Sequence, residues 1–143
     1  MDLQHPEKKM SKSEASPAGT INVLESQESI SKKIKRAVTD SDGEVRFDAD
    51  EKPGISNLLS ILAASTSSTP EDTALSYSRY GDLKNDTAEA VIELLRPIQE
   101  RFRELESDPA ETNRLIQLGS SKAQEIASAT LERAKDNIGL LKP

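Results

Sequence analysis

The segment KNDTAEAVIELLRPIQERFRELE, residues 84–106, has the strongest helical periodicity in the chain. Its apolar residues recur at steps of three and four, which places them on one face of an α-helix. This stripe consists of Ala88, Val91, Ile92, Leu95, Ile98, Phe102 and Leu105. Pro97 lies inside the segment and lacks an amide hydrogen, so we predict a kink there. A long amphipathic helix of this kind favours an all-α fold.

Two further helices are predicted from strong start signals, in which a capping residue precedes a proline and acidic residues. The first signal is Thr69–Asp72, and its helix is predicted to end near Tyr80. The second is Asp108–Glu111, and its helix is predicted to run to about Asn137. The positions that we expect to be buried in this last helix are Leu115, Leu118, Ile126 and Leu131.

The first half of the chain predicts two more helices with a short non-helical segment between them. Residues 26–38 begin with serines that can cap and end in Lys and Arg, which favour a helix C-terminus. Lys52-Pro53-Gly54 opens the other helix. Its apolar face consists of Ile55, Leu58, Leu59 and Leu62. Between the two helices we predict a turn at residues 39–43 and one short extended segment at residues 44–48.

The overall prediction is an all-α helical bundle preceded by a flexible loop. Residues 1–20 contain two prolines and a glycine, and we expect residues 1–25 to be mobile. We therefore divide the chain functionally into residues 1–25, a loop segment, and residues 26–143, a helical domain. The 143 residues are 34% hydrophobic and only 3% aromatic. This lean composition suits a bundle with apolar surface left for a partner.

Charge is distributed unevenly along the chain. The net charge is −6, of which residues 1–40 contribute +1 and residues 41–143 contribute −7. A polyanion should therefore approach the N-terminal third first, and the net charge of the whole chain argues against a general nucleic-acid coat protein. Since there is no cysteine, disulfides and thiolate metal sites are excluded as well. Neither a signal peptide nor a membrane-spanning segment is recognisable, so we predict a cytosolic protein without a membrane partner.

The candidate functional residues are Lys9, Met10, Ser11, Lys12 and Ser13, which read KMSKS. Two lysines three apart on a mobile loop can close over a polyphosphate and stabilise the charge that develops on a pyrophosphate leaving group. In this interpretation Lys9 and Lys12 are catalytic, and the serines and backbone amides donate hydrogen bonds. Met10 would anchor the loop. The alternative is a solvated surface loop that happens to contain lysines.

The pentapeptide resembles the second signature of class I aminoacyl-tRNA synthetases, which binds the pyrophosphate end of ATP. Three downstream segments are similar, in order and spacing, to bacterial tryptophanyl-tRNA synthetases. They are IKRAVTDS at residues 34–41, KPGISNLL at residues 52–59 and LRPIQER at residues 95–101. Gly119, Lys122 and Ala123 extend the similarity, so it covers nearly the whole chain.

This resemblance implies a tryptophan–tRNA ligase that uses ATP with Mg²⁺, tryptophan and the tRNA for tryptophan, and that acts as a homodimer. It also implies a Rossmann-type catalytic domain before the loop and an anticodon-binding type of helical domain after it. In this chain only residues 9–13 match the ATP site of the family. The His-containing signature is missing, and His5 receives no role. We therefore predict a C-terminal portion of the enzyme, with Met1 an internal methionine, that cannot activate tryptophan alone.

Three weaker patterns each allow a functional and a structural interpretation. The cluster of Lys32, Lys33, Lys35 and Arg36 could contact RNA phosphates or could simply favour a helix C-terminus. Tyr77 and Tyr80 could stack on an unpaired base or pack against a neighbouring helix. Asp40 and Asp42 beside Gly43 hint at a calcium loop, but the other ligands are missing and we predict a turn.

Two functions of different classes follow. In the first, the chain supplies the ATP-clamping loop and the tRNA-docking domain of a tryptophan–tRNA ligase. In the second, it is a stand-alone helical module for RNA binding or dimerisation, derived from the synthetase, with an unused loop. The retention of both lysines and both serines favours the first.

Overall fold

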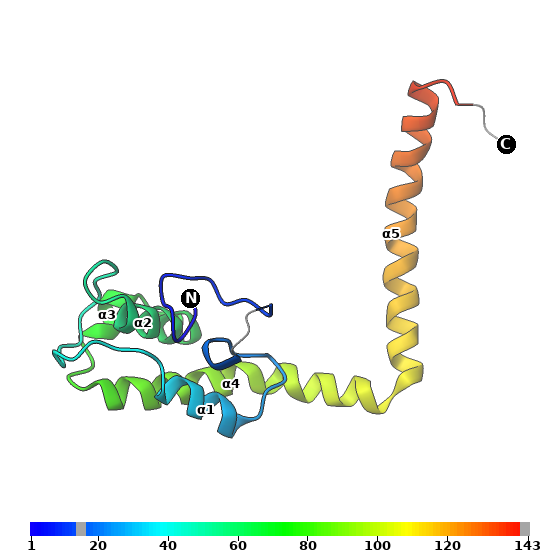
Figure 1. Cartoon of the computed structure of the whole chain (residues 1–143). Helices are drawn as coiled ribbons and strands as arrows, with labels where there is room; N and C mark the ends of the chain where they lie inside the picture. The colour runs from blue at the N-terminus through cyan, green and yellow to red at the C-terminus, as the bar shows by residue number, and fades with distance from the viewer. Residues whose placement is uncertain (14–16, 141–143) are drawn as a thin grey trace. The chain divides into compact units, whose positions relative to one another are not determined.

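The computed structural model describes residues 1–13 and 17–140 (Figure 1). A short 3₁₀ helix, η1, spans Pro17–Gly19. The α-helices are α1 (Gln27–Lys35), α2 (Pro53–Thr66), α3 (Pro70–Ala74), α4 (Tyr80–Ser107) and α5 (Pro109–Asn137). No strand occurs in the part of the chain that the structure describes, which confirms the predicted helical fold class. Residues 44–48 form no regular element.

The predicted starts of α1, α3 and α5 are confirmed, and each has a local cause, whereas α4 begins at Tyr80, earlier than the predicted residue 84. The Ser26 and Thr69 side chains accept hydrogen bonds from the backbone N–H groups of Ser29 (3.3 Å) and Asp72 (3.2 Å). At α5, the Asp108 carboxylate accepts from the Glu111 N–H at 3.0 Å. Such caps satisfy amides that have no partner in the first turn of a helix.

The predicted end of the third helix is wrong. Helix α3 stops at Ala74, and α4 begins at Tyr80, where we expected the earlier helix to finish. The N–H groups of Ser76 and Tyr77 donate to carbonyl oxygens three residues back, at 3.1 and 3.2 Å. These turn-type bonds take the chain out of the α-helix and allow a new helix to begin at Tyr80.

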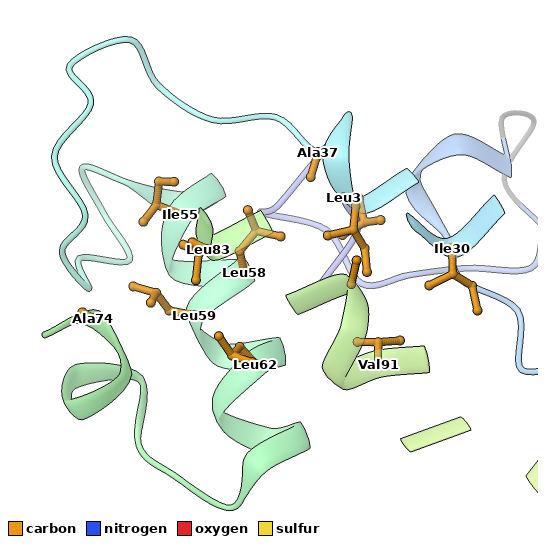
Figure 2. Packing of buried hydrophobic residues seen from close by; sticks show 12 residues of the cluster. Leu3, Ile30, Ala37, Ile55, Leu58, Leu59, Leu62, Ala74, Leu83 and Val91 are labelled. Carbon is orange, nitrogen blue, oxygen red and sulfur yellow. The ribbon is translucent and has the colours of Figure 1, made fainter. Parts of the chain in front are cut away.

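The structure consists of two compact units, Met1–Gln99 and Glu100–Pro143. The predicted functional boundary at residue 25 lies inside the first unit and stays a prediction, as does the kink at Pro97, through which α4 continues. The first unit contains the hydrophobic core (Figure 2). Its buried members are Leu3, Ile30, Ile34, Ala37, Ile55, Leu58, Leu59, Leu62, Ala74, Leu83, Ala88 and Val91.

The predicted face of α2 is confirmed, because Ile55, Leu58 and Leu59 are each 0% exposed. The N-terminal segment is better fixed than we predicted. Leu3 is 1% exposed and packs in the same core (Figure 2). The N-terminal ammonium of Met1 also donates to Asn57 Oδ1 of α2 at 2.9 Å. Burial of a leucine contributes about 2 kcal/mol, which is enough to hold a short terminal segment in place.

The expected burial in the second unit is wrong. Leu118, Ile126 and Leu131 are all exposed, and no residue of α5 is buried. In α4, Ile98 and Phe102 are exposed as well. Helical periodicity shows which residues share a face, but a face becomes buried only where another element covers it.

Candidate functional site

The segment with the two candidate lysines is closed at its base by backbone hydrogen bonds. The Leu3 N–H donates to the Gly19 carbonyl at 2.9 Å, and the Asp2 N–H donates to the Lys8 carbonyl at 2.8 Å. The Leu3 carbonyl in turn accepts from the Val38 N–H at 2.8 Å. Residues 9–13 therefore project from a base that is fixed to the first unit on both sides.

Asp2 gives this base a specific geometry. The carboxylate is buried and accepts the backbone N–H groups of Gln4 and His5 at 2.7 and 2.9 Å. A Cβ atom at Gly19 would lie 2.0 Å from Asp2 Oδ1, which is far inside van der Waals contact. A side chain at position 19 would therefore displace the Asp2 carboxylate, which lies directly beside the Cα atom.

The five motif residues differ in their surroundings. Met10 is partly buried and packs against the hydrophobic core. Ser11 is half-buried, and its carbonyl accepts from Thr20 Oγ1 at 3.3 Å. Ser13 donates its N–H to Ser11 Oγ at 3.2 Å. Lys9 and Lys12 are exposed, and neither forms an ion pair with another described residue. The two ammonium groups are thus available to an anion.

A hollow of about 470 Å³ lies beside the loop. It is lined by Met10, Lys12, Thr20, Ile21, Asn22, Val23 and Leu24. Lys12 of the motif thus lines the hollow, and most of the other lining residues are apolar. Gln99 of α4 is buried and donates Nε2 to the carbonyls of Val23 (2.7 Å) and Glu25 (3.0 Å). These bonds fix the backbone at the Val23 side of the hollow.

The basic cluster on α1 is not uniform. Lys33 is half-buried, and its Nζ lies 2.6 Å from Glu25 Oε1 and 2.8 Å from the Thr20 carbonyl. Burial favours a higher pKa for Glu25, but hydrogen bonds from Lys33, Ser29 and the Asn22 N–H outweigh it and lower the pKa. Lys33 therefore holds the loop and α1 together, whereas Lys32, Lys35 and Arg36 are exposed.

The second polar cluster surrounds Lys52, whose side chain is 1% exposed. Its ammonium donates to Asp42, to Asp40 (3.2 Å) and to Tyr80 Oη (3.1 Å). Burial opposes the charge of Lys52, but these hydrogen bonds outweigh it and raise the pKa of Lys52. The same contact holds the pKa of Asp42 well below its usual range. The cluster ties the turn at Asp40–Gly43 to the first residues of α2 and α4, so Asp40 and Asp42 serve the turn that we predicted.

The tyrosines have intramolecular partners. Tyr77 donates its hydroxyl to Asp86 at 2.7 Å, and Tyr80 donates to Asp40 within the Lys52 cluster. Both rings are partly buried against the core. These contacts favour the packing interpretation over base stacking.

Sequence reasoning did not identify the roles of Lys33, Lys52 and Gln99. One signal was present for Lys52, because it occupies the N-cap of α2, where Ser, Thr, Asp or Asn is usual. The partners of Gln99 lie 74 and 76 residues away in sequence, and no local pattern could reveal them.

The first unit thus defines a helical domain that carries a tethered lysine loop, an arrangement suited to binding a polyphosphate. Residues 1–96 match the family described as tRNA synthetases class I (W and Y). The chain belongs to this family.

Individual relatives agree with this assignment. The chain is 45% identical over 143 residues to tryptophan–tRNA ligase 1 of Streptomyces coelicolor, which covers 100% of the chain and 43% of that protein. It is 45% identical over 142 residues to tryptophan–tRNA ligase of Mycobacterium leprae, covering 98% of the chain and 41% of that protein. The crystal structure of tryptophanyl-tRNA synthetase from Mycoplasma pneumoniae superimposes with a TM-score of 0.87 at 34% identity, over 99% of this chain and 43% of that one. The chain therefore spans less than half the length of these relatives.

None of the described helices is long and apolar enough to cross a membrane. No group of three His, Asp or Glu residues suited to a metal ion occurs within residues 1–13 and 17–140.

Proposed function

We propose that the chain is the part of a tryptophan–tRNA ligase that supplies the ATP-clamping loop and the helical domain for tRNA docking. The observation that supports this most is the pair of exposed lysines, Lys9 and Lys12, which form no ion pair with a described residue and lie on a loop whose base is fixed. The names of the relatives support the choice of tryptophan and tRNA as substrates. The cytosolic location and the homodimer stay predictions.

The proposed chemistry follows from charge. When the carboxylate of tryptophan attacks the α-phosphorus of ATP, the bond to the bridging oxygen breaks and pyrophosphate leaves with the bonding electrons. Lys9 and Lys12 would stabilise the negative charge that develops on this leaving group. The stabilisation raises the rate only if the lysines approach more closely in the transition state than in the ground state, and a hinged loop permits this.

The fixed base and the partly buried Met10 limit what can move. Lys9 and Lys12 could change position while the hydrogen bonds at Lys8 and Gly19 stay in place, and Met10 would remain the contact of this segment with the core. Mg²⁺ would arrive as the counter-ion of ATP and be held by its phosphates.

The proposal is tested in a chimera in which this chain replaces the matching segment of the Streptomyces coelicolor ligase. We expect the chimera to catalyse tryptophan-dependent exchange of pyrophosphate into ATP. Lys9→Ala and Lys12→Ala should each lower kcat of exchange about 100-fold, the effect of removing one donor to a developing charge. Lys122→Ala, which removes an exposed lysine of α5, is the matched control and should leave kcat unchanged.

An active chimera that is insensitive to both lysine substitutions would show that the loop does not clamp ATP. The isolated chain gives a second readout. We expect it to show no exchange by itself, but to bind pyrophosphate with amide chemical-shift changes at residues 9–13. Absence of those changes at high pyrophosphate concentration would also contradict the proposal.

A further inference from the structure

The exposed cations at the end of α1 are not explained by the stability of that helix. A helix C-terminus carries a partial negative charge and favours a nearby cation. Here that position is already occupied by Lys84 of α4, whose Nζ donates to the carbonyls of Ala37 (2.8 Å) and Lys35 (3.4 Å). Burial in this position lowers the pKa of Lys84.

Additional cations at the same helix end repel one another, so their presence calls for another cause. Lys33 has such a cause, because it pairs with Glu25. Lys32, Lys35 and Arg36 form no ion pair with any residue that the structure describes. The stability of α1 therefore does not explain these three cations.

The acidic residues of the same region do not compensate for them. Asp2 is buried and accepts two backbone N–H groups, and Glu25 contacts Lys33 and Ser29. Asp40 contacts Lys52 and Tyr80. These three carboxylates already have partners. Glu28 of α1 is exposed, but it offsets only one of the three exposed cations, so the end of α1 keeps a positive surface on a chain of net charge −6.

Two of these cations share a hollow of about 420 Å³. Its lining consists of Gln4, Pro17, Ala18, Ser29, Lys32, Lys33 and Arg36. Lys32 and Arg36 are four residues apart and lie on one helix face. The Arg36 carbonyl accepts a hydrogen bond from Gln4 Nε2 at 3.0 Å, which fixes the backbone of Arg36. Lys35 is exposed but does not line the hollow.

We propose that Lys32 and Arg36 form a docking surface for the phosphate backbone of an RNA, distinct from the ATP-clamping lysines. A lysine and an arginine on adjacent turns can contact successive phosphates, whereas the hollow offers no aromatic side chain for an adenine ring. The surface reads no bases, so it positions an RNA without selecting its sequence. The identification of the polyanion as tRNA rests on the function proposed above.

The test is the salt dependence of tRNA binding by the purified chain. Each phosphate contact contributes about 0.7 to 0.9 to the slope of log K against log salt. The double variant Lys32→Gln, Arg36→Gln should therefore lower the magnitude of that slope by about 1.5. Lys35→Gln removes a cation from the same helix outside the hollow and should leave the slope unchanged. Circular dichroism verifies that each variant is folded. If the double variant is unfolded, the slope is measured for Lys32→Gln and Arg36→Gln separately.

The outcomes separate this inference from the proposed function. If tRNA binds and the slope is unchanged in the double variant, the docking surface is wrong, although tRNA docking elsewhere on the domain stands. If Lys35→Gln lowers the slope as much as Lys32→Gln does, the effect is diffuse charge and the located surface is again wrong. If the chain binds no tRNA even at low salt, both this surface and the docking role fail, while the exchange assay still decides the ATP clamp.

Discussion

Lys32 and Lys33 are neighbours in sequence, yet they have different surroundings and different roles. Successive residues of an α-helix point about 100° apart, so one faces Glu25 and the Thr20 carbonyl while the other faces solvent. The same reasoning applies to Lys52, which composition alone would place on the surface but which is 2% exposed. At the scale of single residues, function depends on which face of an element a side chain occupies.

Gly54 illustrates a residue whose side chain is absent for a steric reason. A Cβ atom there would lie 2.2 Å from the Val38 carbonyl oxygen, so α2 could not pass this close to the segment after α1. Gly54→Ala should therefore lower the free energy of unfolding by about 2 kcal/mol through overpacking. Gly81→Ala is the control in the same unit, since nothing lies within 4 Å of its Cβ position. Urea denaturation measures both, and equal midpoints would contradict the close approach.

The two tyrosines give a spectroscopic prediction. Burial and the hydrogen bond to Asp40 raise the pKa of Tyr80 to about 12, and burial with the bond to Asp86 raises that of Tyr77 to about 12. The chain has two tyrosines and no tryptophan, so tyrosinate absorbance reports these groups alone. Because the folded-state pKa values are raised, their contribution to stability is complete below about pH 10 and is lost as pH rises towards 12.

We therefore expect a native titration midpoint near 12 for both hydroxyls. Tyr80→Phe should remove half of the absorbance change and leave the midpoint of Tyr77 in place, and Tyr77→Phe is the reciprocal control. A midpoint near 10 in a chain that circular dichroism shows to be folded would mean that these hydroxyls do not have the described partners.

At the scale of elements, the sequence predicted what is decided locally. The starts of α1, α3 and α5 follow from caps and prolines within four residues, and the sequence predicted all three. The end of α3 was not predicted. Beyond it, Tyr77 and Tyr80 have partners at Asp86 and in the Lys52 cluster, and no local rule contains these contacts. For the site, the loop was recognisable from five adjacent residues, whereas the contacts that fix its base come from positions distant in sequence.

The burial of α2 and α5 can be compared by one type of substitution. Leu59 of α2 is 0% exposed and Leu131 of α5 is 53% exposed. Leu59→Ala should lower the free energy of unfolding by about 3 kcal/mol, because it removes buried methyl groups and leaves a cavity. Leu131→Ala should change it by less than about 0.5 kcal/mol. A large loss at Leu131, measured by urea denaturation in dilute solution, would show that another surface covers α5.

At the scale of the whole molecule, the core is confined to one of the two compact units. All members of the hydrophobic cluster lie before residue 92, and none of residues 100–140 is buried. The first unit can therefore unfold cooperatively, since its helices share one core. Within the second unit, helical hydrogen bonds and ion pairs such as Arg114–Glu111 at 2.6 Å remain, and exposed pairs contribute little.

This difference predicts that unfolding is not two-state. Both tyrosines lie in the first unit, so near-ultraviolet absorbance follows its core, whereas far-ultraviolet circular dichroism also follows the 29-residue helix α5. With rising urea, we expect part of the circular dichroism signal to be lost before the tyrosine signal changes, because α5 lacks buried side chains to stabilise it. A truncated chain that ends at residue 107 should lose the early phase and keep the later one. Coincident transitions in the full chain would instead require that α5 shares the cooperative stability of the core.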